Sequence, residues 1–158
     1  MNWNPLSFFK SSANNLLTAT DKQLLVEAIQ AAEKNTSGEI RVFVETHVPK
    51  KQDSLQRARE LFYKNKMNET KDHNGVLVYV AVSDKKLAIY GDQSIHEKVG
   101  IEFWYNQVQE MTGHFKKENY VQGITQVVGE IGQALSTHFP YDRSNDVNEL
   151  SDEIMVGK

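Results

Sequence analysis

The chain has 158 residues, a net charge of −3 at pH 7 and no cysteine. This length suffices for one domain with its own hydrophobic core, and the missing cysteine excludes disulfides, a thiolate metal site and a cysteine nucleophile. Charges of both signs are interspersed, which argues against a nucleic-acid partner. Because no secretory signal pattern and no stretch of about 20 apolar residues occur, we expect a cytoplasmic protein without a transmembrane segment.

The first predicted helix follows an N-terminal extension of residues 1–17, and the domain is expected to span residues 18–140. The helix is predicted to begin at a capping box over residues 20–23, Thr-Asp-Lys-Gln, where a hydroxyl precedes an amide side chain by three positions. Apolar residues then recur at helical spacing. The helix should end near Asn35, because a Ser-Gly pair follows it.

A strand is predicted over residues 39–46, where apolar and polar residues alternate. Its two faces carry, respectively, Ile40, Val42 and Val44, and Glu39, Arg41, Phe43 and Glu45. The second face must be partly wet or covered by a polar helix. A further capping box, over residues 53–56, predicts that a helix follows this strand.

An uninterrupted apolar run at residues 76–82 predicts a buried strand, and a second short run at residues 87–90 follows after a polar connection. A connection this short joins antiparallel neighbours, so the two runs predict a β-hairpin. The order strand, helix, strand over residues 39–82 predicts a right-handed βαβ crossover between parallel strands. Together these elements predict an α/β fold.

The rest of the domain is predicted to be helical. Residues 94–97, Ser-Ile-His-Glu, form the pattern of a capping box for a short helix after the hairpin. Apolar residues at helical spacing predict longer helices over residues 101–115 and 119–139. In the last helix, Gly129 and Gly132 leave one side without side chains, which predicts close contact with another element.

Polar side chains are predicted to gather at one end of the sheet. The crossover places the starts of both parallel strands at the same edge, and the hairpin brings its outer ends together. We therefore expect Glu39, Asp72, Asn74 and Asp92 to lie on one rim. Oxygen ligands on loops suit Ca²⁺ or Mg²⁺. The alternative is that Asp72, Asn74 and Asp92 only form turns and helix caps.

Four separated segments carry a family resemblance. They are residues 32–42 (AEKNTSGEIRV), 74–80 (NGVLVYV), 89–92 (IYGD) and 148–154 (NELSDEI). Together they resemble the TPM domain, which is shared by a thylakoid-lumen phosphatase-like protein, a photosystem II repair protein and a nematode receptor-associated membrane protein. The resemblance is to a compact, soluble bacterial branch of that family.

The resemblance implies a three-layer α/β/α sandwich, with a small mixed sheet flanked by about five helices. It also implies that a divalent cation binds at the family's site positions, which match Glu39, Asp72, Asn74 and Asp92. Acid phosphatase activity is attributed to the plant member. The acidic C-terminal tail, residues 141–158, is expected to pack on the domain because it contains one of the resembling motifs.

These observations lead to two expected functions. The first is a protein that binds Ca²⁺ or Mg²⁺ and acts as an interaction or assembly module with a protein partner. A membrane-associated partner is left open, and we expect a monomer or weak oligomer. The alternative is a metal-dependent acid phosphatase in which Asp72 or Asp92 serves as base or nucleophile. A purely structural role without a cation is a third class.

Overall fold

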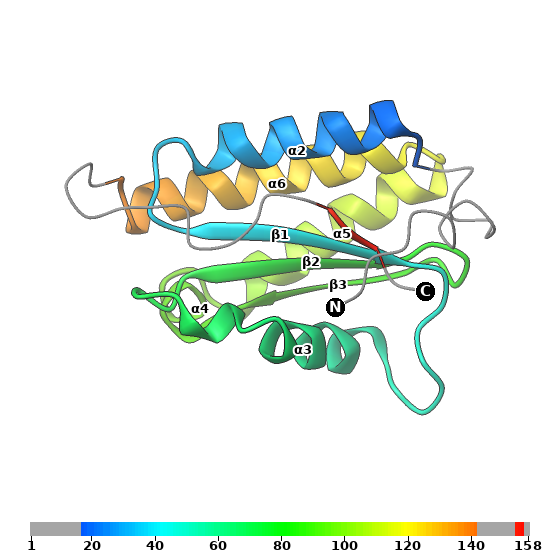
Figure 1. The fold of residues 1–158 in the computed structure, drawn as a ribbon, viewed down its shortest axis with the longest axis horizontal. Helices are drawn as coiled ribbons and strands as arrows, with labels where there is room; N and C mark the ends of the chain where they lie inside the picture. Colours follow the sequence, from blue (N-terminus) through cyan, green and yellow to red (C-terminus); the bar gives the residue numbers. More distant parts are fainter. Residues whose placement is uncertain (1–16, 142–153, 157–158) are drawn as a thin grey trace.

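Alternation of apolar strands with amphipathic helices produces a mixed sheet between two helical layers (Figure 1). The structure, a computed structural model, describes residues 17–141 and 154–156. Its strands are β1 (Glu39–Glu45), β2 (Gly75–Ala81), β3 (Lys86–Gly91) and β4 (Met155–Val156). Its helices are α2 (Ala19–Glu33), α3 (Ser54–Lys64), α4 (Gln93–Val99), α5 (Ile101–Lys116) and α6 (Tyr120–His138), with a 3₁₀ turn, η2 (Met67–Glu69). The predicted three-layer α/β fold with five helices is confirmed for these residues.

The strand order in the sheet is β3-β2-β1-β4. Strands β1 and β2 are parallel, with Glu39 opposite Gly75, and α3 connects them as the crossover predicts. Strands β2 and β3 are antiparallel, with Val76 opposite Gly91, which confirms the hairpin. The parallel pairing of β4 with β1 was not predicted.

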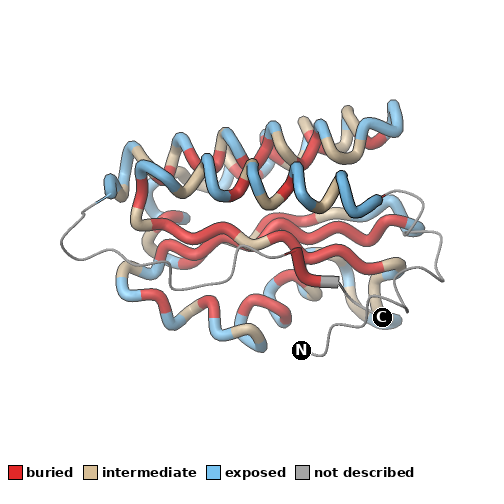
Figure 2. The backbone as a smooth tube through the Cα atoms, turned by 45° about the horizontal axis from the view of Figure 1, so that its top comes forward, coloured by how far each residue is buried: buried red, intermediate tan, exposed pale blue. Residues whose placement is uncertain are grey.

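Two hydrophobic cores lie on opposite faces of the sheet. Helices α2, α5 and α6 cover the face that carries Ile40, Val42 and Val44. The sequence left the opposite face either wet or covered by a polar helix. The amphipathic helix α3 covers it, and Phe43 is only 1% exposed. Figure 2 shows the central strands buried along their length between the two layers.

The first helix starts two residues earlier than its sequence pattern predicts. Thr18 is the N-cap of α2: its hydroxyl accepts from the N–H of Asp21 at 3.1 Å, and Asp21 accepts from the N–H of Thr18 at 2.9 Å. The predicted capping box at residues 20–23 is therefore wrong, because those residues already lie inside the helix. The box at Asp53–Gln56 is confirmed at the start of α3.

The last helix packs tightly on the first through Gly132. A methyl group on Gly132 would come 2.5 Å from the Cβ of Ala32 in α2, so only glycine permits this approach. The expectation of close contact is correct for Gly132 and wrong for Gly129, which has open space where a side chain would extend.

The sheet edge beside β1 is covered by the short strand β4. Met155 and Val156 pair with Phe43 and Val44 of β1, and Ile154 and Met155 are each 7% exposed. The rest of the predicted acidic tail, residues 142–153 and 157–158, lies outside the described residues. In the part of the chain that the structure describes, no helix combines the length and apolarity needed to cross a bilayer.

Candidate functional site

The starts of β1 and β2 and the end of β3 meet at one end of the sheet, where they form a rim of five polar residues: Ser37, Asp72, His73, Asn74 and Asp92. The register places Glu39 opposite Gly75 and Val76 opposite Gly91, so the residues flanking these positions are neighbours. In addition, the N–H of Asp92 donates to the carbonyl of Gly75 at 2.9 Å. The structure thus brings together the chain segments that the sequence placed at one rim.

Ser37 links two of the rim residues. Its hydroxyl donates to Oδ2 of Asp72 and accepts from Nδ2 of Asn74, both at 3.1 Å. The loop before β1 is thereby tied to the loop before β2. Because a serine hydroxyl has one proton and two lone pairs, it can also accept a second hydrogen bond or contact a cation in this position.

His73 forms the turn between Asp72 and Asn74. Its backbone has a φ of 49°, in the left-handed region, and its carbonyl accepts from the N–H of Ser94 at 3.1 Å. The side chain is 59% exposed, with Nδ1 3.4 Å from Oδ2 of Asp92. In the sequence, only its position between Asp72 and Asn74 points to a place in the rim.

Asp92 begins α4 as its N-cap. Its Oδ1 accepts from the N–H of Gln93 at 2.8 Å, and its carbonyl accepts from the N–H of His96. The predicted capping box at residues 94–97 is therefore wrong, because Asp92 takes that role first. Asp92 is only 6% exposed, and its Oδ2 accepts no hydrogen bond, although Nδ1 of His73 lies 3.4 Å from it.

Asn74 and Thr70 add two more buried oxygens of this kind. Asn74 is completely buried, and its Oδ1 has no donor although its Nδ2 is bonded to Ser37. The Oγ1 of Thr70 is likewise buried without a partner. Most buried polar atoms in proteins have a hydrogen-bond partner. The rim and Thr70, whose carbonyl accepts from the N–H of His73 at 3.2 Å, therefore contain acceptor oxygens that a ligand or water could satisfy.

The expected convergence of three carboxylates does not form. Within residues 17–141 and 154–156, no group of three or more histidine or acidic side chains could hold a metal ion. Asp72 turns toward Ser37, and Asp92 caps α4. Glu39 is buried at the start of β1. Asp72 and Asp92 thus share the rim, but hydrogen bonds hold their carboxylates on different partners, Ser37 and the N–H of Gln93.

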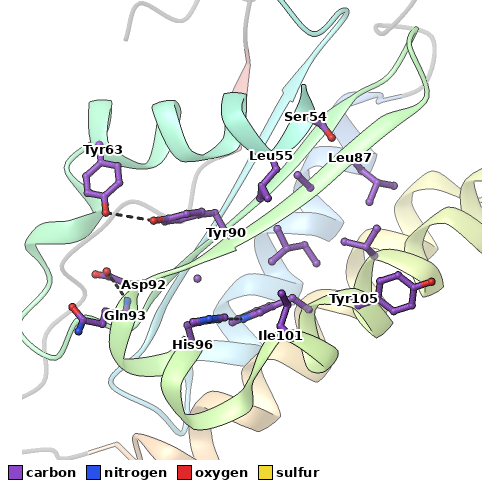
Figure 3. A pocket seen from close by; sticks show the side chains of 15 residues that line it. Ser54, Leu55, Tyr63, Leu87, Tyr90, Asp92, Gln93, His96, Ile101 and Tyr105 are labelled. Carbon is purple, nitrogen blue, oxygen red and sulfur yellow. Dashed lines mark hydrogen bonds between the residues drawn. The ribbon is translucent and has the colours of Figure 1, made fainter. Parts of the chain in front are cut away.

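Two tyrosines stand beside the rim at the end of β3 (Figure 3). The hydroxyls of Tyr63, from α3, and Tyr90, from β3, are 3.4 Å apart. Burial, followed by this hydrogen bond and the charges of Tyr63 and Asp92, raises the pKa of Tyr90 to about 12. Tyr90 is therefore a neutral hydroxyl at physiological pH. The sequence did not single out either tyrosine, since their proximity depends on how α3 crosses β3.

Comparisons with known proteins agree with this architecture. A family model described as the TPM domain matches residues 11–134. The chain is similar to the BA42 protein of the psychrophilic bacterium Bizionia argentinensis, solved by NMR. The identity is 42% and the TM-score 0.81, over 89% of this chain and 95% of that chain. No curated protein matches the chain.

Two more distant NMR structures share the fold alone. The N-terminal domain of the cg2496 protein from Corynebacterium glutamicum is 10% identical, with a TM-score of 0.60 over 75% of this chain and 74% of that chain. The N-terminal domain of a P. gingivalis protein is 15% identical, with a TM-score of 0.67 over 80% and 83%. On the family match and its likeness to the BA42 protein, this chain belongs to the TPM domain family.

Proposed function

We propose that this TPM-domain protein is an interaction module that binds a divalent cation, Ca²⁺ or Mg²⁺, at the rim. The observation that carries the proposal is a pair of buried oxygens that accept no hydrogen bond. They are Oδ1 of Asn74 and Oδ2 of Asp92, the latter with Nδ1 of His73 3.4 Å away. A buried acceptor that lacks a partner costs about 1–3 kcal/mol. A hard cation, which prefers oxygen ligands, would remove that cost at both atoms.

The ligand set contains two carboxylates, Asp72 and Asp92, with the neutral oxygens of Asn74 and Ser37 beside them. Two carboxylates balance the charge of one divalent ion, and water completes the coordination. Sites with so few charged ligands bind weakly. We therefore expect a dissociation constant on the order of 10⁻⁴ M or weaker.

The cation would act by ordering the rim rather than by chemistry. It would join the loop before β2, which contains the left-handed residue His73, to the start of α4. A rim ordered in this way presents a fixed surface to a protein partner, including one held at a membrane. We expect the protein itself to be a monomer or weak oligomer.

The test is a titration with CaCl₂ and, separately, with MgCl₂, followed by amide shifts in NMR spectra. Shifts should concentrate at residues 37–39, 70–75 and 91–96, and they should vanish in Asp92→Asn. The matched control is Asp84→Asn, because Asp84 lies in the hairpin turn, where it accepts from the N–H of Val48 at 2.7 Å. The control should titrate like the wild type.

Three other outcomes would replace the proposal. Shifts confined to the acidic residues 142–153 would move the cation site to the tail. Cation-dependent hydrolysis of a phosphomonoester that is lost in Asp92→Asn, with the fold intact, would make the protein a phosphatase. No response to either cation in the millimolar range would leave a structural role.

A further inference from the structure

Strand β3 is the open edge of the sheet within the described residues. It pairs with β2 on one side only, whereas β4 covers the opposite edge. The N–H of Asp92 donates to Gly75, so the alternation of an antiparallel ladder directs the backbone groups of Leu87, Ile89 and Gly91 away from β2. Three residues of β3 therefore offer unpaired N–H and C=O groups at the edge.

A groove runs along this edge between α3 and α5, and we call it the edge groove (Figure 3). Its volume is about 670 Å³. One wall carries Leu55 and Tyr63 of α3, and the other carries Ile101, Trp104 and Tyr105 of α5. Leu87 to Gly91 form its floor.

The walls of the edge groove are unusually apolar for a surface. Of the six large hydrophobic side chains exposed in the described residues, four line it: Leu55 at 54%, Tyr63 at 45%, Ile101 at 76% and Tyr105 at 63%. Edge strands are usually protected by charges, proline or a covering segment. In β3 only Lys86, at its start, is charged. The remaining way to protect the β3 edge is a segment of chain that covers it.

The shape of the groove selects an extended segment as its occupant. Both walls are apolar, and side chains of a strand point alternately to opposite sides. An occupant therefore needs large apolar residues at both odd and even positions. A second copy of the chain would have to bring its own α3 and α5 into the same space as these two helices, which disfavours edge-to-edge pairing.

We propose that residues 3–10 of this chain occupy the edge groove as an additional strand antiparallel to β3. The segment reads Trp-Asn-Pro-Leu-Ser-Phe-Phe-Lys. Leu6 and Phe8 would point to one wall, and Trp3 and Phe9 to the other. Pro5 is compatible with this position, because proline is tolerated on an edge strand.

The place where the described chain begins supports this occupant. Leu17 is buried and lies with Val80 and Val82 at the end of β2, and Val80 pairs with Leu87, the first apolar residue of β3. From Leu17 back to Phe9 the chain can span roughly 26 Å. The edge from Leu87 to Gly91 is roughly 14 Å long. A chain of this length is therefore long enough to reach the groove, and it would enter from the Leu87 end, as an antiparallel strand requires.

The test is amide hydrogen–deuterium exchange in the full chain, measured by NMR. A groove occupied about nine-tenths of the time slows exchange of the outward amides of Leu87, Ile89 and Gly91 about tenfold. The double variant Phe8→Ser/Phe9→Ser should restore fast exchange at these three amides. The inward amides of Ala88 and Tyr90 should be unchanged, which shows that the sheet is intact.

The matched control is Asn14→Ser/Asn15→Ser, which alters the same number of residues between the proposed strand and Leu17. This control should keep the wild-type protection. Equally fast exchange of the outward amides in wild type and in the Phe8/Phe9 variant would overturn the proposal. Protection that survives in that variant and disappears on dilution would assign the groove to a second copy.

A spin label gives an independent measurement. Because the chain contains no cysteine, Ser7→Cys provides a single attachment site for a nitroxide. The label should broaden the amide signals of Leu55, Ile89 and Tyr105. If the signals of these three residues are not broadened, the proposal is also overturned. Neither measurement involves a cation, so the result does not depend on whether the rim binds Ca²⁺ or Mg²⁺.

Discussion

Gly91 and Trp104 pack so closely that a methyl group on Gly91 would lie 2.4 Å from Cζ2 of Trp104. The indole cannot turn away easily, because its Nε1 donates to Nδ1 of His96 at 3.0 Å. Gly91 ends β3, His96 belongs to α4 and Trp104 to α5. This one contact therefore aligns the end of the hairpin with the two helices that follow it.

The first prediction is that Gly91→Ala destabilises the fold by about 1–3 kcal/mol, the usual cost of forcing an extra methyl group into a packed site. Urea denaturation measures the change. Gly113→Ala in α5 is the control, because open space surrounds that position. We expect Gly113→Ala to stabilise the protein by about 0.5–1 kcal/mol. Equal effects of the two substitutions would contradict the packing argument.

The second prediction concerns a buried ion pair on the α3 side of the sheet. Glu45, 5% exposed, accepts from Arg57 Nε at 2.8 Å and Nη2 at 3.1 Å, and from the Tyr79 hydroxyl at 2.5 Å. Arg57→Ala leaves the buried carboxylate without its cation, so we expect a loss of about 3–5 kcal/mol.

Chemical denaturation of the Arg57 variant is compared with that of Arg59→Ala. Arg59 is exposed and lies 5.9 Å from the ring centroid of Tyr63. Its removal should cost no more than about 1 kcal/mol. If both arginine variants lose the same stability, the pair with Glu45 has no special role in the fold.

The third prediction is a pH dependence between α5 and α6. Hydrogen bonding to Glu110, then partial burial and the charge of Glu110, raises the pKa of Glu130 from 4.5 to about 7. The folded protein keeps this proton at a pH where the unfolded chain has released it. Stability should therefore fall as the pH rises from about 4.5 to about 7.

Glu130→Gln removes this dependence. Relative to wild type, the variant should gain stability at pH 8 and little at pH 4, by at most about 1 kcal/mol because much of the side chain is solvated. Thermal unfolding at both pH values provides the measurement, and Glu97→Gln, an exposed change on α4, is the control. A gain that is the same at both pH values would rule out the shared proton.

The fourth prediction rests on the proposed cation site. Ser37→Ala removes the hydroxyl that links Asp72 and Asn74, and the loss of such a supporting hydrogen bond typically weakens a metal site 10–100-fold. We expect Ca²⁺ affinity to fall by about that factor, measured by the same amide shifts. Ser94→Ala, at the start of α4, is the control and should leave the affinity unchanged within about twofold.

Much of the fold is predictable from local patterns. The apolar runs at 76–82 and 87–90, separated by a short polar connection, require a hairpin in any arrangement, and the preceding strand and helix then require the crossover. The rim follows from these two facts alone. The start of α2 was harder, because Thr18 and Thr20 each offer a hydroxyl, and only the extended backbone at Thr18 makes it the cap.

The details of the rim depend on contacts between distant residues. The sequence places Asp72 and Ser37 at the same end of the sheet, but it contains no signal that the serine orients the carboxylate. The same holds for the two residues of β4, which are too few to show a strand period. The open edge groove likewise arises from the angles at which α3 and α5 flank β3.

The pairing of Met155 and Val156 with β1 has a practical consequence for handling the protein. Proteolysis or truncation before Ile154 would remove β4 from its place beside β1 and expose that edge of the sheet. Purified material clipped there should self-associate more strongly than intact material. An affinity tag is therefore better preceded by a flexible spacer when it follows Lys158.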